Sequence, residues 1–143
     1  ELAIFRRRQV GIIYQFYNLI AILNVQENIE IPLELDGRKA DKKEMDEMLE
    51  RLGLTQRRTH LPNELSGGQQ QRTSIGRALI TRPSLVLADE PTGNLDTKSS
   101  SEILNLLKRS NHELDQTIIM ITHNMELAKA ADRIIMIEDG KIK

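Results

Sequence analysis

Two short apolar runs that end in ionisable side chains restrict this chain to few folds. The runs are SLVLADE (84–90) and TIIMITH (117–123), and the stretch SSSEILNLLKRSNHEL (99–114) between them has the pattern of an amphipathic helix. Continuous apolar strands of this kind are typical of parallel sheets whose faces are both covered. Strands that alternate with helices indicate one layered domain. We therefore predict an α/β fold with a largely parallel sheet, and both runs as buried strands.

The residues before these runs predict one more strand and a group of helices. QVGIIYQ (9–15) reads as a strand, and 39–54 reads as a helix that ends at Gly53. The apolar residues of that helix recur at helical spacing and form one stripe: Met45, Met48, Leu49 and Leu52. For 18–37 we expect short helical pieces with a loop near Pro32 and Gly37.

After the second apolar run we expect a short helix over 125–133, then a strand over 133–137 that enters a turn at Asp139-Gly140. The expected organisation has three parts. A strand segment covers 1–17, a mainly helical subdomain covers 18–80, and the C-terminal part of the α/β core covers 81–143.

The segment ELSGGQQQR (64–72) has the pattern of a helix start that can bind an anion. Ser66 is a favourable N-cap, and Gln69 three positions later completes a capping box. Gly67 and Gly68 allow close backbone approach at the positive end of the helix, which suits a phosphate. The chain nevertheless contains no GxxxxGK[ST] phosphate loop, which leaves open whose phosphate this segment would meet.

Three predicted strands end in groups that could do chemistry: Gln15, the pair Asp89-Glu90, and His123. A single strand-end Gln or His is ordinary, whereas two adjacent carboxylates at a buried strand end favour a bound cation. Ligands of open α/β sheets bind at the carboxyl ends of the strands. Because all three strands carry such groups, we predict a common site at this edge of the sheet.

Composition excludes several classes of function. The net charge is -1, from 20 basic and 21 acidic side chains, so there is no general electrostatic basis for binding nucleic acid. Cysteine is absent, which excludes disulfides and thiolate metal sites. No apolar run is long enough to span a bilayer.

In order along the chain, five motifs resemble the nucleotide-binding domain of ABC-type ATPases, a P-loop NTPase-like fold. They are YQFYNL (14–19) as the Q-loop, LSGGQQQR (65–72) as the signature, LVLADEP (85–91) as the Walker B strand with its glutamate, GNLD (93–96) as the D-loop, and ITH (121–123) as the switch histidine. The residues in and around these motifs are most similar to those of the ATPases of lipoprotein-releasing, macrolide-export, antimicrobial-peptide-export and cell-division transporters.

The resemblance implies ATP and Mg²⁺ as ligands and a role for each matched residue. Asp89 would hold Mg²⁺, and Gln15 would contact Mg²⁺ or the attacking water. Glu90 would orient or deprotonate that water, and His123 would contact the γ-phosphate. The positions expected to bind nucleotide across a dimer seam are Ser66, Gly67, Gly68, Gln69, Asn94 and Asp96.

The resemblance also implies partners and a location. A second nucleotide-binding domain would pair head to tail with this one, and a transmembrane permease would dock on the helical subdomain at the cytoplasmic face of a bacterial membrane. No nucleic acid is expected as a partner.

The family's phosphate loop, adenine-stacking aromatic residue and N-terminal strands have no match in this chain. We therefore expect an N-terminally truncated domain, inactive alone, with a gap between the strands at 117–121 and 133–137.

Other functions with the same motifs are an ABC-type ATPase of DNA repair, a translation factor and a non-enzymatic fragment. A DNA-repair head would carry a long coiled coil between Gln15 and Ser66, and no sustained heptad is present there. Translation factors of this kind carry two nucleotide-binding domains and differ in sequence around EPTGNLD (90–96). The intact Glu90 and His123 argue against a parent protein without enzymatic activity. An ATPase subunit that drives export or extraction is the prediction that remains.

Overall fold

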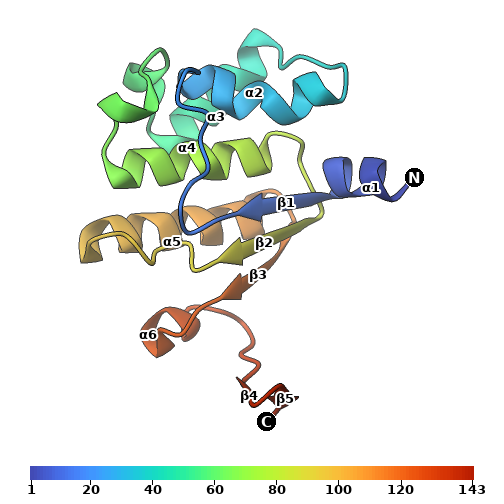
Figure 1. Ribbon diagram of the computed structural model, residues 1–143, viewed down its shortest axis with the longest axis vertical. Coiled ribbons are helices and arrows are strands. Elements are labelled where there is room, and N and C mark those ends of the chain that lie inside the picture. The colour runs from blue at the N-terminus through green and yellow to red at the C-terminus, as the bar shows by residue number, and fades with distance from the viewer.

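The computed structural model describes residues 1–143 and is built around three parallel strands. These are β1 (Val10–Ile13), β2 (Leu85–Asp89) and β3 (Thr117–Ile121), in the order β1-β2-β3. The central strand β2 pairs with both neighbours, so all three carboxyl ends lie at one edge of the sheet, where the arrowheads point in Figure 1. The predicted α/β class and parallel sheet are confirmed.

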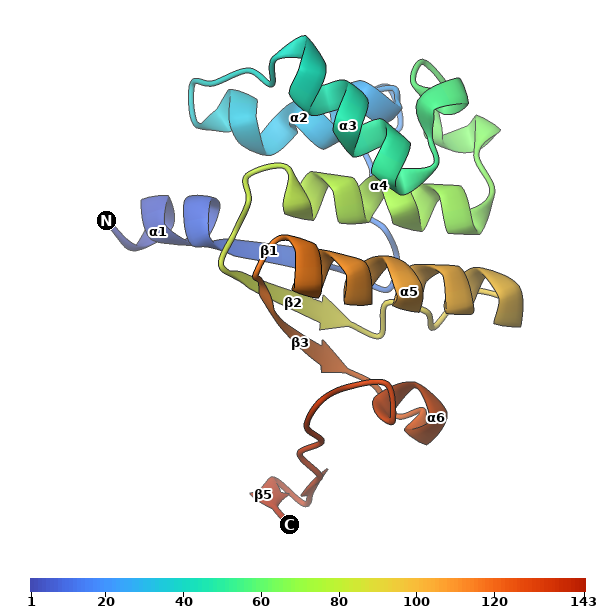
Figure 2. The ribbon, with the colours of Figure 1, turned by 180° about the vertical axis from the view of Figure 1, so that it is seen from behind.

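Four helices form layers on one face of this sheet (Figure 1): α2 (Val25–Leu35), α3 (Lys42–Leu52), α4 (Gly67–Leu79) and α5 (Thr97–Glu113). The helix α1 (Leu2–Gln9) leads into β1, and α6 (Met125–Ala128) follows β3. Short 3₁₀ turns lie at Thr55–Arg57 and Pro62–Glu64. α4 contacts β1 and α5 contacts β3, while α2 and α3 pack on the outer side of α4 (Figures 1 and 2). None of the helices has both the length and the apolar surface needed to cross a bilayer.

The two faces of the sheet differ in burial. Gly11 and Ile13 of β1 and Val86 and Ala88 of β2 are buried on the helix-covered face. On the other face Ile12 is 43% exposed and Ile119 is 51% exposed. The prediction of 117–123 as a buried strand is wrong, because β3 lies at the edge of the sheet and has a helix on one face only.

The predicted helix over 39–54 is confirmed as α3. Its stripe is buried in the core, Asp41 caps its start, and Gly53 ends it in the left-handed conformation at φ 67°. The expected loop near Gly37 is confirmed, since α2 ends at Leu35 and Gly37 has a left-handed φ of 70°. Its extension to Pro32 is wrong, because Pro32 lies inside α2. The capping box of Asn24 with Glu27 and the burial of Ile29 and Leu33 against α4 keep this helix intact past the proline.

The C-terminal segment forms a hairpin separate from the main sheet. β4 (Ile137–Glu138) pairs antiparallel with β5 (Lys141–Ile142) across Asp139-Gly140, whose φ values of 52° and 73° are left-handed. The turn prediction is confirmed. The predicted strand over 133–137 is wrong, since only Ile137 is in a strand, and the outer edge of β3 has no strand partner in the chain. Helix α1, which the sequence analysis did not predict, has no buried residue.

Candidate functional site

The predicted site residues lie at the end of the molecule where the three strands finish. The N-terminus of α4 and the N-terminus of α5 lie at this same end (Figure 1). The strand ends, the loops that follow them and the first turns of two helices therefore share one surface. Two groups of contacts organise it, one around Glu90 and one around the loop after β1.

Glu90 and His123 form a direct pair across the ends of β2 and β3. Glu90 Oε1 lies 2.6 Å from His123 Nδ1 and accepts the His123 backbone N–H at 2.9 Å. Glu90 has a left-handed φ of 44°, and its own N–H bonds to Ile121 O at 2.9 Å. A left-handed non-glycine residue costs about 1–2 kcal/mol, and the hydrogen bonds to β3 and His123 hold Glu90 in this geometry.

The surroundings of Glu90 keep its carboxyl ionised. Partial burial raises the pKa of Glu90. The opposing effects together are larger: hydrogen bonds from the side chain and backbone of His123, the charge of that histidine and a hydrogen bond from the Thr122 hydroxyl all lower the pKa. The net pKa of Glu90 is below its ordinary value. Its side chain is 18% exposed and that of His123 is 87% exposed, so the pair is open to solvent from the histidine side.

The loop after β1, residues 14–24, lies against the segment that follows β2. A Cβ built on Gly93 would lie 2.5 Å from Gln15 Nε2, so the absence of a side chain at Gly93 makes room for Gln15. Asn94 Nδ2 donates to Gln15 O at 3.3 Å, and the Gly93 N–H donates to Glu90 O at 3.0 Å. These contacts join Gln15 to the backbone of Glu90 through two residues.

The start of α4 has the geometry that the sequence predicted. Ser66 Oγ accepts the Gln69 N–H at 3.2 Å, and Gln69 Oε1 accepts the Ser66 N–H at 2.9 Å. The Ser66 side chain is exposed and its hydroxyl hydrogen remains free to donate. Gly67 and Gly68 are closely packed, since added Cβ atoms would lie 3.1 Å from the Tyr17 hydroxyl and 3.1 Å from the Ser99 hydroxyl.

Asp96 serves the start of α5. It is the N-cap of α5 and accepts the Ser99 N–H at 2.7 Å, and the Ser99 hydroxyl donates to its second oxygen at 3.3 Å. These hydrogen bonds from the backbone and hydroxyl of Ser99 hold the pKa of Asp96 below its ordinary value. Asp96 thus also positions the Ser99 hydroxyl that packs against Gly68.

Sequence reasoning missed three side chains that hold the loop after β1. Gln71 Nε2 donates to Tyr14 O at 3.2 Å, and Arg77 donates to Tyr17 O at 2.7 Å and to Asn18 O at 2.6 Å. Asn28 accepts the Ile20 N–H and donates to three carbonyls of residues 20–24. The burial of Gln71 could have been predicted from the sequence, because Gln71 is a polar residue on the same helical stripe as Ile75 and Ala78. No sequence pattern indicates the contacts of Arg77 with the loop.

Comparison with known families decides the membership of the chain. The family described as ABC transporter matches residues 3–93, which include the strand β1, the start of α4 and the strand β2. The chain belongs to the ABC transporter family. This ABC transporter chain spans about three fifths of the length of several curated relatives, with shares of 62% and 64% in two of them.

Relatives whose names state a function are similar over nearly the whole chain. The lipoprotein-releasing system ATP-binding protein LolD of Pseudoalteromonas translucida is 44% identical over 99% of this chain and 62% of its own length. The macrolide export ATP-binding/permease protein MacB of Bartonella henselae is 48% identical over 99% of this chain and 22% of its own.

Among solved structures, a dimeric post-hydrolysis state of the ATP-binding cassette MJ0796, bound to ADP and Pi, has a TM-score of 0.85 and 40% identity. The match covers 99% of this ABC transporter chain and 64% of that chain.

The carboxylates of this ABC transporter chain fit a cation that arrives with phosphates. No group of three or more His, Cys, Asp or Glu side chains could by itself hold a metal ion. Asp89 at the end of β2 is exposed, and Mg²⁺ usually takes one or two carboxylates and completes its shell with phosphate oxygens and water. Asp89 and Gln15 suit that chemistry.

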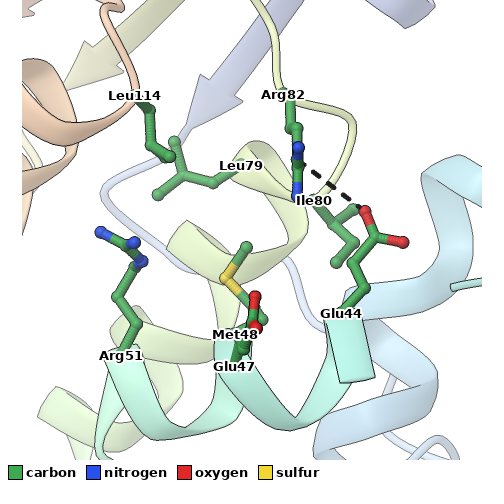
Figure 3. A pocket seen from close by; sticks show the side chains of 8 residues that line it. All are labelled: Glu44, Glu47, Met48, Arg51, Leu79, Ile80, Arg82 and Leu114. Carbon is green, nitrogen blue, oxygen red and sulfur yellow. Dashed lines mark ion pairs between the residues drawn. The ribbon is translucent and has the colours of Figure 1, made fainter. Parts of the chain in front are cut away.

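The hollow drawn in Figure 3 lies apart from the site at the strand ends. It has a volume of about 50 Å³ and lies between α3 and the C-terminal end of α4, where Arg82 pairs with Glu44 at 4.0 Å. Ligand pockets for small molecules are several times larger. This hollow is at the opposite end of α4 from Ser66 and takes no part in the site of this ABC transporter chain.

Proposed function

We propose that the protein is the ATP-binding subunit of an ABC transporter, an ATPase that couples hydrolysis of Mg-ATP to export or extraction of a substrate through a membrane permease. The observation that carries the proposal is the Glu90–His123 pair, at 2.6 Å, on the sheet edge where α4 also begins. A carboxylate kept ionised and oriented beside an exposed imidazole suits activation of water next to a phosphate.

In this proposal each residue of the pair has a separate task. Glu90 accepts the proton of the attacking water, and its lowered pKa keeps it in the basic form. With both ring nitrogens protonated, His123 donates Nδ1–H to Glu90, and its Nε2–H is left to donate to the γ-phosphate. Asp89 and Gln15 would hold Mg²⁺, which neutralises charge on the phosphate oxygens when bound.

The start of α4 would bind the nucleotide of a second copy, with which this chain pairs head to tail. Ser66 has a free hydroxyl hydrogen, Gly67 leaves the backbone accessible, and a helix N-terminus favours an anion. No side-chain hydrogen bond joins Ser66 or Asp96 to Glu90 or His123, which fits two half-sites that serve different nucleotides. The dimeric state of the similar cassette supports this arrangement.

The permease would dock at the cytoplasmic face of the membrane, on the surface formed by the loop after β1 and the helices α2 and α3. The loop carries Phe16 at 72% and Ile22 at 83% exposure, an apolar surface suited to a partner helix. Relatives with the names lipoprotein-releasing and macrolide export support a role in outward transport.

The test is hydrolysis of ATP by the full-length gene product, with and without Mg²⁺. We expect phosphate release that needs Mg²⁺ and rises more steeply than linearly with protein concentration, because two copies form each site. Tight ATP binding without hydrolysis, in the presence of its permease, would contradict the proposal.

Gly93→Ala should displace Gln15 and leave the rest of the fold in place. The new methyl group would lie 2.5 Å from Gln15 Nε2, at the far end of a flexible side chain that can swing away. We expect kcat to fall roughly tenfold, since small misplacements in a site are costly, while the melting temperature changes by less than about 3 °C. Gly37→Ala is the control for kcat: its Cβ would meet nothing within 4 Å, but its φ of 70° disfavours alanine, so we expect a lower melting temperature with kcat unchanged. An unchanged kcat in Gly93→Ala would remove Gln15 from the site.

A further inference from the structure

A single buried side chain on α4 bridges the two strand ends that carry Gln15 and Glu90. Gln71 is 0% exposed, and its Nε2 donates to Tyr14 O at 3.2 Å and to Pro91 O at 2.6 Å. Tyr14 directly precedes Gln15, and Pro91 directly follows Glu90. One amide group therefore joins the two backbones just beyond the last strand pair, Ile13 with Ala88, where the site residues begin.

The partners determine the orientation of this amide. Both carbonyl oxygens can only accept hydrogen bonds, so the NH₂ group must face them, and its two hydrogens satisfy one carbonyl each. The Gln71 Oε1 atom on the other side is buried and accepts no hydrogen bond. An unpaired buried acceptor is unfavourable, so the two donated bonds outweigh this cost in holding the side chain.

We propose that Gln71 is a positioning residue: it keeps the loop after β1 in register with the end of β2, so that Gln15 and Glu90 act on the same nucleotide. The proposal rests on the proposed function. Because Gln71 lies on the helix that begins at Ser66, it also links the start of α4 to both strand ends. A nucleotide that binds at Ser66 would therefore affect the positions of Gln15 and Glu90 through the amide of Gln71.

The chain offers a matched control in Gln116. This residue is 3% exposed, its Nε2 donates to Pro83 O at 2.8 Å, and its Oε1 also has no hydrogen-bond partner. Pro83 precedes β2, so Gln116 acts at the amino end of that strand, away from the site. Both residues are buried glutamines that bind a proline carbonyl, and only Gln71 touches the site loops.

The experiment compares Gln71→Met with Gln116→Met in the full-length protein. Methionine fills the space of glutamine and donates no hydrogen bond. For Gln71→Met we expect amide exchange in the nucleotide-free protein to be at least about fivefold faster in both segments, at Asn18 after β1 and at Gly93 and Leu95 after β2, whose N–H groups are hydrogen-bonded. We expect kcat to fall about 10- to 100-fold with the dissociation constant of ATP within about threefold of wild type. Gln116→Met should lose similar thermal stability without either change.

Each outcome decides the proposal. If exchange at both segments stays as in the wild type, or if Gln71→Met and Gln116→Met lower kcat equally, Gln71 is only a structural residue. If Gln71→Met does not fold, Gln71→Asn replaces it, because an amide one methylene shorter cannot span both carbonyls. If the wild type hydrolyses no ATP, the proposed function fails, and the exchange measurement alone decides whether Gln71 holds the two strand ends.

Discussion

Glu90→Gln in the full-length protein is expected to lower ATP turnover by about 10²- to 10⁴-fold, the usual contribution of a general base. In the wild type the His123 backbone N–H donates to Glu90 Oε1 at 2.9 Å, and the amide oxygen of glutamine can still accept this bond. The left-handed backbone at position 90 should therefore persist. Binding of ATP does not need the base. The variant should therefore accumulate as an ATP-bound dimer, which size-exclusion chromatography with Mg-ATP would detect.

The matched control for this variant is Glu126→Gln. Glu126 lies on α6, its side chain is 79% exposed, and it pairs only with Lys129. The same chemical change there should leave kcat within about twofold of wild type, as surface substitutions away from a site do. Normal turnover in Glu90→Gln would exclude Glu90 as the base, and an equal loss in both variants would indicate a non-specific effect of charge.

The lowered pKa of Glu90 has a consequence for the pH profile. A base with a folded-state pKa below the ordinary 4.5 stays deprotonated as pH falls to that value, and it gains a proton only under more acidic conditions. Loss of activity at a pH well above 4.5 therefore comes from another group, and Glu90→Gln should not shift the midpoint of that loss in its residual activity.

Gly11→Ala is expected to destabilise the protein by about 2–3 kcal/mol, near the top of the range for overpacked cores. The added Cβ would lie 2.5 Å from Ala78 O and 3.2 Å from the Pro83 ring. Ala78 O is a backbone atom of α4, so relief requires the whole helix to move off the sheet rather than one rotamer to change. Thermal unfolding should show a melting temperature lower by roughly 5–10 °C.

Two features make this prediction specific to the contact between helix and strand. The φ of Gly11 is outside the left-handed region, so alanine is acceptable to the backbone and is otherwise favourable in place of glycine. Ile12→Ala is the control on the next residue, which points to the uncovered face and is 43% exposed. We expect that control to cost less than about 1.5 kcal/mol. A smaller effect of Gly11→Ala than of Ile12→Ala would contradict the described packing of α4.

Local sequence patterns predicted those elements whose signals lie within a few residues. The stripe from Met45 to Leu52, the stop at Gly53 and the capping box of Ser66 with Gln69 each depend on spacings of three or four positions. The proline in α2 and the edge position of β3 were predicted wrongly, because each depends on what packs against the segment. The buried Ile29 and Leu33 keep α2 helical through Pro32, and the edge position of β3 with one uncovered face leaves it half exposed.

The sequence by itself determined the class of the fold, the polar strand ends and the motifs that mark the family, because each is a short-range pattern of residue types. Only the tertiary structure decided which groups meet. The pairing of Glu90 with His123, the space that Gly93 leaves for Gln15 and the bridge made by Gln71 join residues far apart in the chain. Such contacts follow from the register of three parallel strands and from the position of α4 against them, which no local spacing encodes.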